Sequence, residues 1–81
     1  LQELLSLAEK DDVSAQYNLG IMYDKGLGVA RDYVRAHKWY NLAAAQDSQS
    51  GKGGRDWVAR KMTPAQIRKA QRLAREWRPK K

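Results

Sequence analysis

The chain of 81 residues contains no cysteine, a single histidine and two prolines, and its apolar runs are short. Without cysteine, neither a disulfide framework nor a thiolate metal site can form, and the redox compartment is left open. The longest uninterrupted apolar stretch covers residues 42–45, which is far shorter than a membrane-spanning helix requires. A chain of this length forms at most one small domain, with little room for an enclosed active site.

The residues that catalysis or cofactor binding would need are also scarce. His37 has no second histidine or cysteine with which to share a metal, so we interpret it as a surface or packing residue. The glycines at 26 and 28 lack the third glycine and the preceding strand of a dinucleotide loop, and residues 50–53 lack the upstream glycine of a phosphate loop. The sequence therefore predicts a protein that is not an enzyme and holds no cofactor or metal.

Acidic residues are rare in the C-terminal third, where only Asp56 and Glu76 stand against eleven lysines and arginines. Residues 1–51 contain five basic and seven acidic residues, so the net charge of +7 comes from residues 52–81. Any electrostatic function should therefore depend on that part of the chain.

Apolar residues recur at helical spacing and predict an all-α fold of four to five helices. The expected ranges are 1–10, about 13–25, 33–46, 55–62 and 64–77. Asp12 or Ser14 can cap the second helix and Asp32 the third, while Thr63 and Gln66 form a capping box ahead of the last. Between the third and fourth helices, residues 47–54 read as a polar, glycine-rich and mobile joint.

Helical spacing predicts which residues of the second and third helices pack against neighbouring helices. Gly20 lies inside the second helix, where glycine costs about 1 kcal/mol relative to alanine. It therefore predicts close approach by a backbone or by a large ring such as Trp39. The Trp39-Tyr40 pair and residues around Trp57 fall at core spacing. The small and apolar positions that we expect to face other helices are Ala15, Leu19, Gly20, Met22, Tyr23, Ala36, Trp39, Tyr40, Ala43 and Ala44.

The run from residue 15 to residue 44 resembles the Sel-one-like repeat, a helix-turn-helix unit related to the tetratricopeptide repeat. The positions in register are Ala15, Leu19, Gly20, Tyr23, Gly26, Gly28, Val29, Asp32, Ala36, Trp39, Tyr40, Ala43 and Ala44. On this resemblance, residues 12–47 form one complete repeat and residues 1–10 form the trailing helix of a preceding one. Residues 48–54 are the joint, 55–77 a capping helix pair, and 78–81 a basic tail.

The resemblance implies a tetratricopeptide-like α-solenoid fragment that serves as a non-enzymatic scaffold for a peptide or protein partner. It also implies a protein that is bacterial and exported to the periplasm, as members of the family often are. By similarity, the groove would be lined by first-helix residues, here Ser14, Tyr17, Ile21, Asp24 and Lys25. Because one repeat cannot bury both of its faces, the leucines of residues 1–8 predict either further repeats or self-association.

The last helix supports an alternative function. Arg68, Arg72 and Arg75 recur at one helical face with Lys69 beside them, and Arg60, Lys61, Lys80 and Lys81 can extend this basic patch. Such a face suits an acidic protein, an anionic membrane or nucleic acid. Nucleic acid is disfavoured because Trp57 and Trp77 fall at core spacing rather than among the charges. The simplest reading is a solvated face on a helix that only caps the solenoid.

Overall fold

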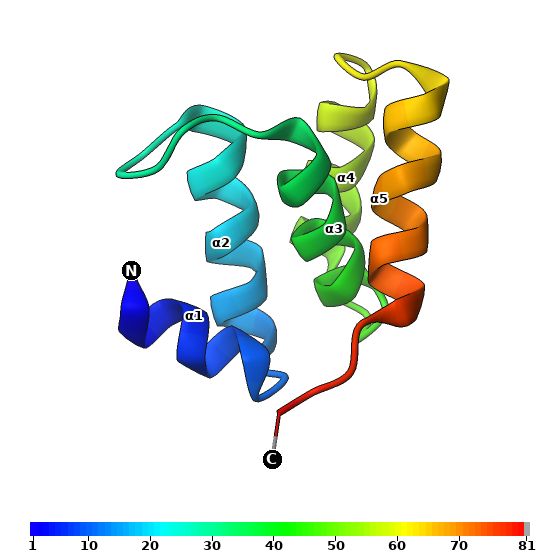
Figure 1. Ribbon diagram of the computed structural model, residues 1–81. Coiled ribbons are helices and arrows are strands. Elements are labelled where there is room, and N and C mark those ends of the chain that lie inside the picture. Colours follow the sequence, from blue (N-terminus) through cyan, green and yellow to red (C-terminus); the bar gives the residue numbers. More distant parts are fainter. Residues whose placement is uncertain (81) are drawn as a thin grey trace.

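The computed structural model describes residues 1–80, which form five α-helices and no strand. Figure 1 shows their arrangement, with bounds α1 (Gln2–Glu9), α2 (Val13–Lys25), α3 (Tyr33–Ala44), α4 (Gln49–Ala59) and α5 (Pro64–Glu76). The all-α prediction is confirmed. Lys81, the last residue of the predicted basic tail, lies outside the described residues.

Helices α2 to α5 alternate in direction, while α1 lies across one end of α2 (Figure 1). Helix α3 is central, because it packs against α2, α4 and α5, whereas α1 packs against α2. Within residues 1–80, no helix combines the length and the apolar character that crossing a bilayer requires.

Local capping chemistry fixes most of the helix ends where the sequence predicted them. The Asp12 carboxylate accepts a hydrogen bond from the Ala15 N–H at 2.8 Å, and the Asp32 carboxylate accepts one from the Arg35 N–H at 3.1 Å. Thr63 and Gln66 form both bonds of a capping box at the start of α5. After α2 the chain reverses at Gly26, whose φ of 69° is the left-handed conformation expected there.

The predicted mobile joint at residues 47–54 is wrong, because most of that segment is the first half of α4. Ser48 caps this helix, its hydroxyl accepting a hydrogen bond from the Gly51 N–H at 2.9 Å. A Cβ at Gly51 would lie 2.9 Å from the Ala44 backbone nitrogen, so the glycine lets α4 approach α3 closely. Gly51 and Gly54 therefore serve helix packing and not chain flexibility.

Two apolar clusters, each with residues of α3, form the core. One gathers around Trp39 and contains Ala8, Ala15, Leu19 and Leu42, with Trp77 packed edge-on against Trp39 at 6.1 Å between ring centroids. The other gathers around Tyr40 and contains Ala36 and Val58. The predicted packing role of the adjacent Trp39 and Tyr40 is therefore confirmed, with the two rings serving different clusters.

The ring that approaches Gly20 belongs to Tyr40 and not to Trp39. A Cβ at Gly20 would lie 2.5 Å from Tyr40 Cδ1, and a Cβ at Gly54 would lie 2.6 Å from Tyr40 Cε1. The Tyr40 ring is thus held between a glycine of α2 and a glycine of α4. Its hydroxyl donates a hydrogen bond of 3.2 Å to the buried carboxylate of Asp24.

One further expectation for the C-terminal third differs from the structure. Trp57, expected in the core, is 54% exposed. The tail does not extend freely, because the Lys80 backbone N–H donates to the Glu9 carbonyl oxygen at 2.7 Å and its Nζ lies 3.1 Å from the Glu9 carboxylate. The tail therefore returns to the end of α1.

Candidate functional site

A surface pocket of about 390 Å³ lies between the starts of α2 and α4. Its lining residues are uncharged, and most carry a hydroxyl or an amide group: Val13, Ser14, Tyr17, Asn18, Gln46, Ser48 and Ser50. Such groups can hydrogen-bond to the backbone and the polar side chains of a bound segment, while Val13 and the Tyr17 ring offer apolar contact.

Helix α2 and the turn after α3 set the shape of this pocket. The Tyr17 ring packs against Tyr40, with 5.7 Å between centroids, so its position is tied to the core. The Gln46 amide donates to the Gln16 side chain at 3.0 Å and to the Asp11 carbonyl oxygen at 3.0 Å. These bonds fix the end of α3 against the start of α2, so the pocket wall is preformed.

The five predicted groove residues divide into two groups. Ser14 and Tyr17 line the pocket. Ile21 is half-buried against the Tyr40 cluster, and Lys25 lies exposed at the other end of α2. Asp24 is only 6% exposed and binds the Tyr40 hydroxyl, so it belongs to the core and cannot serve as an open groove residue.

Comparison with known protein families identifies the repeat formed by α2 and α3. The family model of the Sel1 repeat matches residues 13–48. Residues 13–48 form a Sel1 repeat. The match spans α2, α3 and the N-cap of α4, within one residue of the 12–47 range expected from the sequence. No curated protein and no solved structure matched the chain significantly.

Sel1 repeats adopt a tetratricopeptide-like helical fold, typically mediate protein–protein interaction and are generally found in non-enzymatic scaffolds. The pocket lies within and directly beside this Sel1 repeat, since all its lining residues except Ser50 fall inside residues 13–48. In the described part of the chain, residues 1–80, no three His, Asp or Glu side chains cluster as a metal site would require.

The sequence reasoning missed five residues of the pocket, the first of which is Val13, next to Ser14 at the start of α2. Asn18 lies one turn after Ser14 on α2, so helical periodicity could have indicated it. Gln46, Ser48 and Ser50 come from the end of α3 and the start of α4. Gln46 was expected at the end of the third helix, with no indication that it borders a pocket. Ser48 and Ser50 were not found because residues 47–54 were expected to be mobile, although Ser48 followed three residues later by glycine is compatible with an N-cap.

The predicted basic patch of Arg68, Lys69, Arg72 and Arg75 lies on the exposed face of α5. Within residues 1–80, none of these four side chains forms an ion pair with a carboxylate. The structure therefore leaves this face solvated, and its role as an anion-binding surface stays a prediction.

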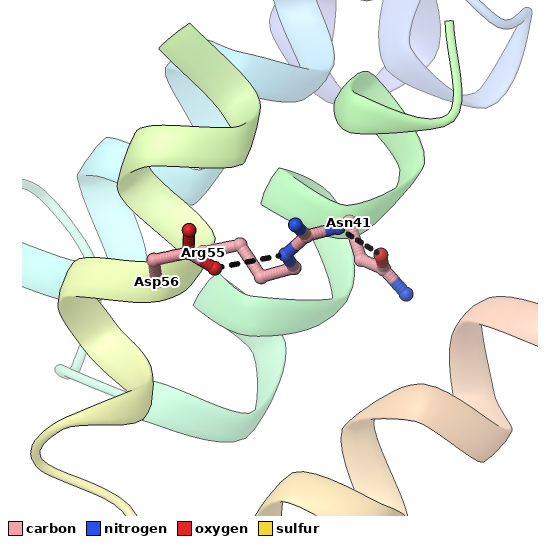
Figure 2. Close-up of polar contacts among 3 residues, drawn as sticks. All are labelled: Asn41, Arg55 and Asp56. Carbon is pink, nitrogen blue, oxygen red and sulfur yellow. Dashed lines mark hydrogen bonds and ion pairs between the residues drawn. The ribbon is translucent and has the colours of Figure 1, made fainter. Parts of the chain in front are cut away.

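A polar cluster lies between α3 of the Sel1 repeat and α4, which follows the repeat. Figure 2 shows Arg55 of α4 reaching across to α3, where its guanidinium donates to the Asn41 side-chain oxygen at 3.3 Å, with Asp56 at 3.4 Å. His37 is 3% exposed, and its Nδ1 has no hydrogen-bond partner among residues 1–80. Burial lowers the pKa of His37, and the nearby Arg55 charge lowers it further, while Asp56 acts in the opposite direction.

The folded Sel1 repeat should therefore lose stability as the pH falls below the ordinary histidine pKa of 6.5. The unfolded chain takes up the proton in that range, whereas the folded chain resists it, so protonation favours unfolding. Urea unfolding at several pH values between 7.5 and 5 measures this loss, and the His37→Gln variant should show a flatter profile. Because His37 is the only histidine, the free energy of unfolding should depend less on pH in the variant. An equal dependence on pH in the variant and the parent chain would contradict this account.

Proposed function

We propose that the chain is a non-enzymatic protein-interaction module whose Sel1 repeat binds a peptide segment in the pocket between α2 and α4. The observation that supports this most directly is the position of the pocket. It opens between the starts of two helices that each come first in a helix pair, and it contains Ser14 and Tyr17 of the groove expected by similarity to tetratricopeptide repeats.

The lining of the pocket indicates what kind of segment it suits. No charged side chain lines it, so binding would rest on hydrogen bonds and on apolar contact with Val13 and Tyr17. Interactions of this kind change little with ionic strength, because screening acts mainly on exposed charges. A suitable partner segment is uncharged, extended and rich in hydrogen-bonding groups, with a small apolar side chain.

Selection of peptides from a display library on the immobilised chain at high salt tests this proposal. Peptides selected in this way should lose affinity by about tenfold or more for the Asn18→Arg and Ser50→Arg variants, since each places a long charged side chain in the pocket. Both positions are exposed, so the variants should fold as the parent chain does.

Gln71→Arg on α5 is the matched control, because it adds the same charge at an exposed position away from the pocket. Its affinity for the selected peptides should stay within about twofold of the parent value. Peptides that bind the two pocket variants as tightly as the control would place the binding site elsewhere and overturn the proposal.

A further inference from the structure

The end of α4 carries an exposed aromatic side chain between two cations. Trp57 is 54% exposed, and it is the one aromatic residue among the large apolar side chains that residues 1–80 leave most exposed. The Lys61 Nζ lies over its ring, 5.1 Å from the centroid, and the Arg60 guanidinium carbon lies 5.9 Å from it. A single exposed apolar side chain is ordinary on a protein surface, so the feature of interest is the pair of cations beside this ring.

A second ring joins this group from the start of α3. Lys61 Nζ lies 5.6 Å from the centroid of the Tyr33 ring, and the guanidinium of Arg31 lies 5.3 Å from the same centroid. The Lys61 ammonium thus stands near both rings and connects α3 to α4. We call this surface the aromatic–basic patch, and it consists of Arg31, Tyr33, Trp57, Arg60 and Lys61.

The positive charge of the aromatic–basic patch is largely uncompensated. Its single ion pair within residues 1–80 joins Lys61 to Asp24 at 3.9 Å, and that carboxylate is also shared with the Tyr40 hydroxyl. Arg31 and Arg60 have no carboxylate within ion-pair distance in the same part of the chain. One free guanidinium group, that of Arg60, therefore lies beside the exposed Trp57, and a second, that of Arg31, lies beside Tyr33.

We propose that the aromatic–basic patch docks an acidic segment of a partner protein, at a surface separate from the pocket. An apolar side chain of that segment would rest on Trp57, and its carboxylates would pair with Arg60 and Arg31. Tryptophan, tyrosine and arginine are the residues that contribute most to protein–protein binding energy, and opposite charges across an interface select the partner.

The same contacts disfavour the two other anionic ligands. Successive bases stack on a row of exposed rings, whereas the patch has one exposed ring, Trp57, and the second, Tyr33, is half-buried. An anionic membrane is bound by a helix with a broad apolar face, whereas the exposed neighbours of Trp57 on α4 are Gly53, Asp56 and Arg60. The protein segment is therefore the occupant that the geometry favours.

Fluorescence anisotropy with two labelled peptides tests the proposal. The first is a short run of glutamates around a central leucine, and the second has glutamine at each glutamate position. The first should bind, and the Trp57→Ala and Arg60→Gln variants should weaken it by about tenfold and about fivefold. Binding should also shield tryptophan from acrylamide, since Trp57 is 54% exposed, whereas Trp39 is 4% exposed and Trp77 is partly buried.

Two control variants separate this surface from the others. Arg72→Gln removes the same charge from the exposed face of α5 and should change the affinity by less than about twofold, as should Asn18→Arg in the pocket. If Arg72→Gln and Arg60→Gln weakened binding of the acidic peptide equally, the peptide would be responding to the net charge of the chain alone, and the proposal would be overturned. It would also be overturned by equal binding of the glutamine peptide, by preference for oligothymidylate or phosphatidylserine vesicles, or by no binding of the acidic peptide.

Discussion

Replacing Gly20 with leucine is expected to lower the free energy of unfolding by about 3 kcal/mol or more. A Cβ at this position would lie 2.5 Å from Tyr40 Cδ1, inside any contact that side chains normally make. The ring cannot swing aside, because Gly54 of α4 also lies against its Cδ1–Cε1 edge and Asp24 binds its hydroxyl. Helices α2 and α3 would have to separate, and urea denaturation would measure the loss.

Gly53→Leu is the matched control for this substitution. Gly53 lies in a helix as Gly20 does, but a Cβ there would meet no atom within 4 Å. The control should be neutral or stabilising by up to about 1 kcal/mol, because leucine is the better helix former. Similar unfolding midpoints for the two variants would refute the close-packing account of Gly20.

The second large effect is expected at Tyr40. Truncation to alanine should lower the free energy of unfolding by about 3–5 kcal/mol, the range for removing a large buried ring. The neighbouring glycines have no side chains with which to fill the space, so the cavity would remain. Tyr40 is 2% exposed and lies in the cluster that joins α2, α3 and α4, so its loss should loosen all three helices.

Tyr40→Phe separates the hydroxyl from the ring. Burial and the Asp24 carboxylate raise the pKa of Tyr40, so its hydroxyl stays protonated and donates to that carboxylate. The phenylalanine variant leaves the buried Asp24 with Lys61 as its remaining partner and should lose about 1–3 kcal/mol.

Tyr17→Phe is the control for Tyr40→Phe. The Tyr17 hydroxyl has no hydrogen-bond partner among residues 1–80, so its removal should change the free energy of unfolding by less than about 0.5 kcal/mol. Unfolding curves that coincide for Tyr40→Phe and the parent chain would show that the Asp24 contact contributes nothing.

The candidate pocket could be predicted only in part. Similarity to tetratricopeptide repeats predicted Ser14 and Tyr17, and helical periodicity within α2 independently places Tyr17 opposite the Leu19 stripe. The same periodicity wrongly assigned Asp24 to an open groove, because it takes no account of α3. In the structure the Tyr40 hydroxyl reaches Asp24 and draws it into the core.

The opposite error occurred at Trp57, where spacing predicted burial and the structure shows exposure. Helix α5 packs against α3, so it does not cover this side of α4. A helical pattern gives the relative directions of side chains, but whether a face is covered depends on where the next helix packs.

The sequence by itself determined the features that act over one or two helical turns. These are the helix periodicity, the caps at Asp32 and Thr63, the left-handed turn at Gly26 and the Sel1 repeat pattern, and each joins residues close together in the chain. Such contacts depend on local geometry, so residue types and spacing suffice to predict them.

Only the tertiary structure decided what contacts between distant residues control. Helix α4 forms despite three glycines, because Ser48 caps it and because Gly51 and Gly54 allow close contact with α3. The same contacts selected Tyr40 as the ring beside Gly20. Glycine spacing alone does not show whether a glycine makes the chain flexible or allows a neighbouring helix to approach closely. The packing of α2, α3 and α4 shows that Gly20, Gly51 and Gly54 allow close approach.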